Sequence, residues 1–197
     1  MNGPDSVRAF GSTTRRKPPQ KASPNLADLN GDIETNLFAW FQPQISTDTG
    51  HIGGFEALAR WRDNAGNSFS PATILPALEN AGQMERLTDS ILTQSLLSLK
   101  KWDERGLNID NIGVNFSESD LSNPRYFEKI AWYLDHFGIE PNRLCIEVLE
   151  SVIAGEADDM ILRNVTRLSE LGCQIDLDDL ALAIPPSPRC AVCPCTA

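Results

Sequence analysis

Short apolar runs and helical apolar spacings alternate along the chain, and they predict strands and helices in turn. Five runs predict strands, at residues 37–42, 52–60, 112–116, 144–148 and 174–177. Helical spacing, caps and stop residues predict helices, from residue 71 onward and at about 84–105, 124–137 and 158–171. Pro43 is expected to close the first strand. Strands that alternate with helices indicate an α/β fold.

The two ends of the chain differ from this pattern. Residues 1–30 are rich in Pro, Ser, Lys and Arg without apolar periodicity, which predicts a disordered arm. The basic cluster Arg15-Arg16-Lys17 is either solvated or a contact for phosphate or membrane. The prolines that follow Ala183 exclude a helix or a central strand there. We therefore expect one domain over residues 31–179, followed by a tail at 180–197 that does not belong to it.

Composition and charge narrow the class of protein. The chain has 197 residues, 41% hydrophobic and 22% charged, which suits one globular domain. Residues 1–28 hold five basic and two acidic residues, so the total of −10 leaves −13 for residues 29–197. An acidic body argues against DNA or RNA binding, which needs Lys and Arg to neutralise phosphates. No signal peptide or membrane-spanning apolar run is seen, so a cytoplasmic protein is expected.

Polar side chains with oxygen atoms lie in or just after four of the predicted strands. They are Glu56, Asn115, Glu147 and the pair Asp178-Asp179. In a parallel barrel the carboxyl ends of the strands meet on one face, where such side chains would gather. Hard oxygen ligands suit Mg²⁺ or Mn²⁺, and carboxylates this close would repel one another without a cation. Any one of them alone could instead be a helix cap or a solvated loop residue.

Residues 55–62 read Phe-Glu-Ala-Leu-Ala-Arg-Trp-Arg, and the tripeptide Glu56-Ala57-Leu58 resembles the signature of the EAL domain. Further matches are Val114-Asn115-Phe116-Ser117, Glu147 with Glu150, and the Asp pair, so the resemblance covers about residues 37–179. EAL domains are magnesium-dependent phosphodiesterases that hydrolyse the bacterial second messenger cyclic di-GMP to the linear dinucleotide. The resemblance implies a partial (β/α)8 barrel of the TIM type, with about the first five strands present.

The resemblance also implies roles for single residues. Metal ligands are implied at Glu56, Asn115, Glu147, Asp178 and Asp179. Contacts to cyclic di-GMP are implied at Gln42, Leu58 and Arg60. Glu150 matches the residue that steadies the loop after the Asp pair, although Leu149 replaces the family's usual Thr.

Beyond Asp179 the chain departs from the family. The family's general-base Lys and a later metal-binding Glu follow the Asp pair, but this chain has no Lys after Lys129 and no Glu after Glu170. Family members continue with Phe-Gly-Thr-Gly, whereas this chain reads Leu180-Ala181-Leu182-Ala183. Codons that encode the tail, preceded by one added T, can be read in another frame as Phe-Gly-Thr-Gly. A single-base deletion is therefore our hypothesis for the tail.

Two functions remain open at this point. The chain is either a truncated phosphodiesterase without activity or a non-catalytic module that binds cyclic di-GMP or a protein partner. A barrel that stops after five strands would expose a strand edge, so self-association through that edge is expected. Cys145 and Cys173 are expected to be buried free thiols. The tail cysteines Cys190, Cys193 and Cys195 are either a zinc-like cluster or a product of the shifted frame.

Overall fold

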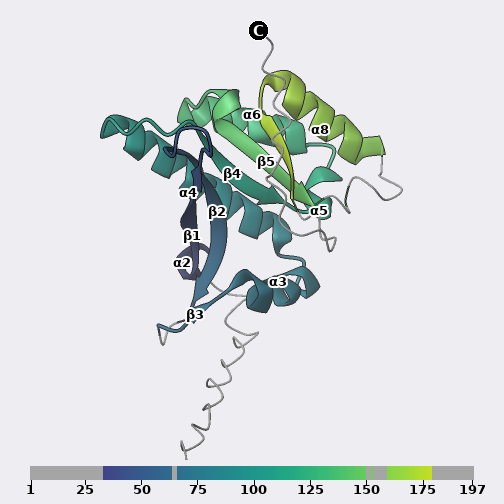
Figure 1. The fold of residues 1–197 in the computed structure, drawn as a ribbon. Coiled ribbons are helices and arrows are strands. Elements are labelled where there is room, and N and C mark those ends of the chain that lie inside the picture. The colour runs from purple at the N-terminus through teal and green to yellow at the C-terminus, as the bar shows by residue number, and fades with distance from the viewer. Residues whose placement is uncertain (1–32, 64–65, 150–151, 153–158, 179–197) are drawn as a thin grey trace, which may run out of the picture.

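The computed structural model of the protein describes residues 33–63, 66–149, 152 and 159–178. Its strands form one sheet in the order β1-β2-β4-β5-β6, with the short β3 paired to β2 (Figure 1). The strands are β1 (Leu37–Ile45), β2 (Ile52–Arg62), β3 (Ser68–Phe69), β4 (Asn111–Phe116), β5 (Leu144–Leu149) and β6 (Gln174–Asp178). The β1–β2 pair is antiparallel, and the successive pairs from β2 to β6 are parallel.

Helices connect the parallel strands, as crossover connections between parallel strands require. They are α2 (Ile33–Asn36), α3 (Pro71–Asn80), α4 (Met84–Glu104), α5 (Glu118–Leu121), α6 (Tyr126–Phe137), the 3₁₀ turn η1 (Pro141–Arg143) and α8 (Asp159–Leu171). Pro71 begins α3 directly after the N-cap Ser70, and Gly138 ends α6 in the left-handed region at φ 67°. Both ends follow the sequence signals.

Alternation along each strand separates two faces of the sheet. One face packs against helices, and its side chains form the core, including Trp61 of β2, Val114 of β4 and Ile146 of β5, all at 0% exposure. The other face carries mostly polar side chains, and we call it the polar face. Its members include Trp40, Gln42, Gln44, Glu56, Leu58, Arg60, Asn111, Gly113, Asn115, Cys145, Glu147, Gln174 and Asp176.

The structure confirms the five predicted strands and the long helices, and it corrects three details. Pro43 does not close β1, which continues to Ile45 with Pro43 opposite Phe55. Within the described residues β1 pairs on one side only, and an edge strand can hold a residue without an N–H. The helix expected from residue 124 begins at Tyr126. The first strand is antiparallel rather than part of an all-parallel barrel wall.

Some expectations fall outside the described residues. These are the arm at 1–30 and the tail at 180–197 with its cysteines and its proposed frameshift, so the domain division stays a prediction. In the part of the chain that the structure describes, no helix has the length and apolar content needed to cross a membrane.

Candidate functional site

Glu56, Asn115 and Glu147 come together on the polar face from three neighbouring strands. Asn115 lies directly opposite Glu147 in the β4–β5 register. Its Nδ2 donates to Glu147 Oε2 at 3.0 Å and to Glu56 Oε1 at 3.3 Å. Glu56 lies 59 positions before Asn115 in the sequence and Glu147 lies 32 positions after it, yet both carboxylates accept from the same amide group. The convergence predicted for these three side chains is confirmed.

Gly113 makes room for the Glu147 carboxylate. A Cβ atom added at Gly113 would overlap Glu147 Oε1, so the carboxylate lies over the glycine backbone. Gln44 Nε2 reaches the same oxygen at 3.5 Å from β1. Glu147 is only 4% exposed despite its charge. Buried carboxylates need such polar contacts, because burial without partners strongly disfavours the charged form.

Asp176 lies beside this cluster, and the sequence analysis did not single it out. It is opposite Glu147 in the β5–β6 register, so both side chains belong to the polar face. Asp178 is opposite Leu149, two residues further along β6. The signal that could have found Asp176 is its spacing of two from Asp178, which places both on one face. The Asp178 side chain, Asp179 and Glu150 lie outside the described residues.

The chemical type of these ligand atoms suits a hard divalent cation. Glu56 and Glu147 present carboxylate oxygens, and a half-turn of the Asn115 amide would present its Oδ1 in place of Nδ2. Mg²⁺ and Mn²⁺ prefer such ligands. No three His, Cys, Asp or Glu side chains lie close enough to bind a metal within residues 33–63, 66–149 and 159–178. The cluster seen there is two carboxylates and an amide.

The predicted substrate contacts lie next to the carboxylates along the β1–β2 hairpin. Gln42 is exposed and directly opposite Glu56. Leu58 and Arg60 follow on the same face, half-buried, with the Arg60 guanidinium 5.5 Å from the centre of the Trp40 ring. Arg60 Nη1 also donates to the carbonyl of Ala59 at 2.9 Å. Along this strand pair, the Glu56 carboxylate is therefore followed by the Arg60 guanidinium and the Trp40 ring.

Cys145 lies on the polar face but is not a candidate nucleophile. Burial, followed by the charges of Glu147 and Asp176, raises the pKa of its thiol to about 12. Burial raises the pKa of Cys173 to about 11. Both thiols stay protonated near neutral pH, and the thiolate is the reactive form. The expectation of two buried free thiols is confirmed.

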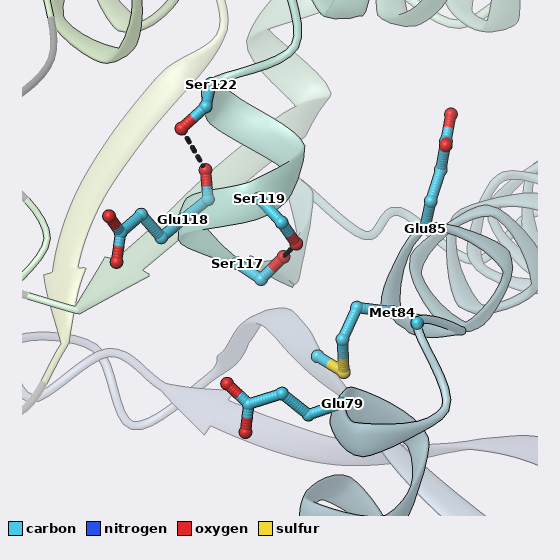
Figure 2. A pocket seen from close by; sticks show the side chains of 8 residues that line it. Glu79, Met84, Glu85, Ser117, Glu118, Ser119 and Ser122 are labelled. Carbon is cyan, nitrogen blue, oxygen red and sulfur yellow. Dashed lines mark hydrogen bonds between the residues drawn. The ribbon is translucent and has the colours of Figure 1, made fainter.

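A hollow of about 490 Å³ lies away from these residues, between the end of α3, the start of α4 and α5 (Figure 2). It is lined by Glu79, Gly82, Met84, Glu85, Ser117, Glu118, Ser119 and Ser122. Glu85 is paired with Lys129 at 2.8 Å, and no residue of the polar face lines the hollow. None of the predicted metal ligands or substrate contacts among the described residues lines it, so the polar face remains the candidate site.

The comparison with protein families agrees with this geometry. A family model described as "EAL domain" matches residues 27–184, which is most of the chain. The chain belongs to the EAL domain family. Two curated relatives from Pseudomonas aeruginosa are named cyclic di-GMP phosphodiesterases: one is 30% identical over 162 residues, and the other, RocR, is 28% identical over 158 residues. These alignments cover 81% and 79% of this chain but only 27% and 40% of the relatives.

Solved structures confirm the fold. The structure titled "PaMucR Phosphodiesterase, c-di-GMP complex" superposes with a TM-score of 0.74 at 27% identity. The match covers 82% of this chain and 65% of that one. The sheet described above is accordingly part of the barrel wall of an EAL domain, as the resemblance implied. The chain spans less than half the length of the curated relatives.

Proposed function

We propose that the polar face binds cyclic di-GMP together with a divalent cation. The observation that carries this proposal is the shared Asn115 amide between Glu56 and Glu147. Two carboxylates that share one amide form a negatively charged site. An anionic dinucleotide can bind there only if a cation lies between the two. The relatives named for cyclic di-GMP support the choice of ligand.

The residues divide the work of recognition between them. We assign the cation to Glu56, Asn115 and Glu147, with Asp178 and Asp179 as further ligands by their match to the family. A bound Mg²⁺ or Mn²⁺ would neutralise phosphoryl charge and lower the pKa of a water molecule. Arg60 supplies a fixed positive charge for a phosphate, Leu58 an apolar contact, and Gln42 hydrogen-bonding groups beside Glu56. Glu150 is assigned to steadying the loop after the Asp pair.

We further propose that these 197 residues bind the dinucleotide without hydrolysing it. Phosphodiester hydrolysis by water needs a general base near the attacking water. Neither a Lys after Lys129 nor a Glu after Glu170 is present to take the family's remaining roles.

The second candidate function is regulation through protein contacts, and it rests on the edge strand β6. Among the described residues this strand pairs only with β5, and its Leu177 is 50% exposed. Sedimentation velocity of the chain over a range of concentrations tests self-association through this edge.

The test is a calorimetric titration with cyclic di-GMP at fixed Mn²⁺, beside a hydrolysis assay under the same conditions. We expect saturable binding that requires Mn²⁺, and no linear product. Glu147→Gln keeps the side-chain shape but removes the charge, so it should abolish the binding that requires Mn²⁺. Glu118→Gln is the matched control, since this carboxylate lines the hollow of Figure 2 and should leave binding unchanged.

The two parts of the proposal fail separately. Absence of binding at any Mn²⁺ concentration, in a chain with folded circular dichroism, would refute the assignment of the ligand. Release of the linear dinucleotide, lost in Glu147→Gln, would refute only the claim that the chain does not hydrolyse it.

A further inference from the structure

Trp40 is a large exposed aromatic side chain on the ligand-facing side of the β1–β2 hairpin. It lies directly opposite Leu58, on the same face as Glu56 and Arg60, and it is 53% exposed. Exposing an indole to water is unfavourable, because about 25 cal/mol is lost for each Å² of apolar surface left uncovered. A single exposed aromatic side chain is normal on a protein surface, so the neighbours of Trp40 decide whether it marks a contact.

The neighbours of Trp40 make it a platform rather than an isolated ring. The Arg60 guanidinium lies over the indole at 5.5 Å from its centre, and the pairing is repeated one step along the strands, where the Arg62 guanidinium lies 5.0 Å from the centre of the Phe38 ring. Guanidinium groups stack on aromatic rings and still keep donors for a phosphate. This end of the polar face therefore combines stacking surface with positive charge.

The spacing from the carboxylate cluster suits one nucleotide. Trp40 and Leu58 lie one two-residue step along the strands from Gln42 and Glu56, which is about 7 Å at 3.4 Å per residue. A ligand phosphate held through a cation at Glu56 would place its attached base over the Trp40–Leu58 pair. Accordingly, we infer that a purine base of the bound dinucleotide stacks on the indole ring of Trp40, and we call this ring the stacking seat. The inference rests on the proposed function, since it names a subsite of the same face.

The other tryptophans provide a matched control. Trp61 is 0% exposed in the core, and Trp102 packs against Phe41 and Phe55 under the sheet. Trp132 is 56% exposed on α6, stacked on His136 at 4.7 Å between ring centres. It matches Trp40 in exposure but does not belong to the polar face. Loss of Trp132 therefore tests the general effect of removing an exposed indole.

The experiment compares the full chain with Trp40→Ala, Trp40→Phe and Trp132→Ala by calorimetric titration with cyclic di-GMP and Mn²⁺. Base–aromatic stacking is worth about 1–3 kcal/mol per base, so Trp40→Ala should weaken binding about 5- to 150-fold. Trp40→Phe keeps a ring and should recover most of the affinity, and Trp132→Ala should bind like the parent chain. Tryptophan emission should fall on binding in the parent chain and in Trp132→Ala, but not in Trp40→Phe.

The outcomes separate this inference from the proposal beneath it. If the parent chain binds and Trp40→Ala binds equally well, the stacking seat is wrong and the proposed function stands. If Trp132→Ala loses as much affinity as Trp40→Ala, the effect is unspecific and the seat is likewise wrong. If the parent chain does not bind cyclic di-GMP, both fall together. Circular dichroism of each variant excludes misfolding, which a half-exposed position should not cause.

Discussion

Replacing Gly113 by Ala tests whether the glycine exists to accommodate Glu147. The backbone of Gly113 is not in the left-handed region, so Ala can adopt its conformation without strain. The added Cβ would overlap the Glu147 carboxylate, which is 4% exposed and has little free space. The carboxylate must move, which disturbs the contact from Gln44 to Oε1 and the hydrogen bond from Asn115 to Oε2.

The expected cost follows from three terms. Overpacking a buried site costs about 1–3 kcal/mol, and losing a hydrogen bond to a charged group costs about 1.5–3 kcal/mol. Ala recovers about 0.4–1 kcal/mol by restricting the unfolded chain. Since the first two terms overlap, we expect the free energy of unfolding to fall by about 2 kcal/mol. For a chain of this size that lowers the Tm by about 4–8 °C.

The assay is urea unfolding followed by far-UV circular dichroism, with a double-mutant cycle. Gly53→Ala is the control, because its Cβ would meet only Asp110 Oδ2 at an ordinary 3.5 Å. In a Glu147→Ala background the overlap is gone, so Gly113→Ala should be neutral or slightly stabilising. An equal cost of Gly113→Ala in both backgrounds, or an equal cost at Gly53, would refute the reasoning.

Three further predictions concern other parts of the fold. Asp120, 1% exposed, accepts from Thr88 Oγ1 at 2.8 Å, so Asp120→Ala should lower the free energy of unfolding in urea by about 2–3 kcal/mol. Cys145, with a pKa raised to about 12, should resist iodoacetamide at pH 8 until the chain unfolds, as read by peptide mass spectrometry; faster labelling than in urea would contradict this. The hydrogen bond from Arg143 lowers the pKa of Asp103 from 3.8, so this pair stabilises the fold above pH 3.8 and the contribution is lost as the pH falls through the lowered value. Arg143→Gln should remove this loss of stability at low pH, which is worth at most about 1 kcal/mol in the free energy of unfolding because the site is exposed. Thermal unfolding curves recorded at several pH values measure it.

The sequence predicted the elements whose pattern is strong and long. Leu87, Ile91 and Leu99 of α4 keep helical spacing over several turns and are buried as expected. The position of Asn115 in β4 and of Glu147 in β5 followed from short apolar runs with clear ends. Short elements were not predicted, because they have too few residues to show a hydrophobic period. Even so, α5 has a local signal, since Ser117 and Asp120 form a capping box.

Direction and register were not predictable from the pattern alone. Alternation with a period of two assigns side chains to faces, but it is the same for parallel and antiparallel neighbours. The antiparallel direction of β1 is what brings Gln44 to Glu147, and no property of Gln44 itself indicates that contact. The register likewise decides that Asp176, rather than Asp178, faces Glu147. Residue type and spacing thus predicted the members of the site, and pairing between strands decided their neighbours.

The same register limits the repulsion between Glu56 and Glu147. Glu56 and Glu147 belong to strands that are not adjacent, because β4 lies between them. On β4, Gly113 and Asn115 are the polar-face residues at this level: one leaves space for a carboxylate and the other donates a hydrogen bond to both. Like charges directly opposite each other destabilise a sheet, and Glu147 has one such neighbour in Asp176 of β6, whereas Glu56 is not directly opposite it. The uncharged β4 between Glu56 and Glu147 thus keeps the two carboxylates within reach of one Asn115 amide without placing them in direct register.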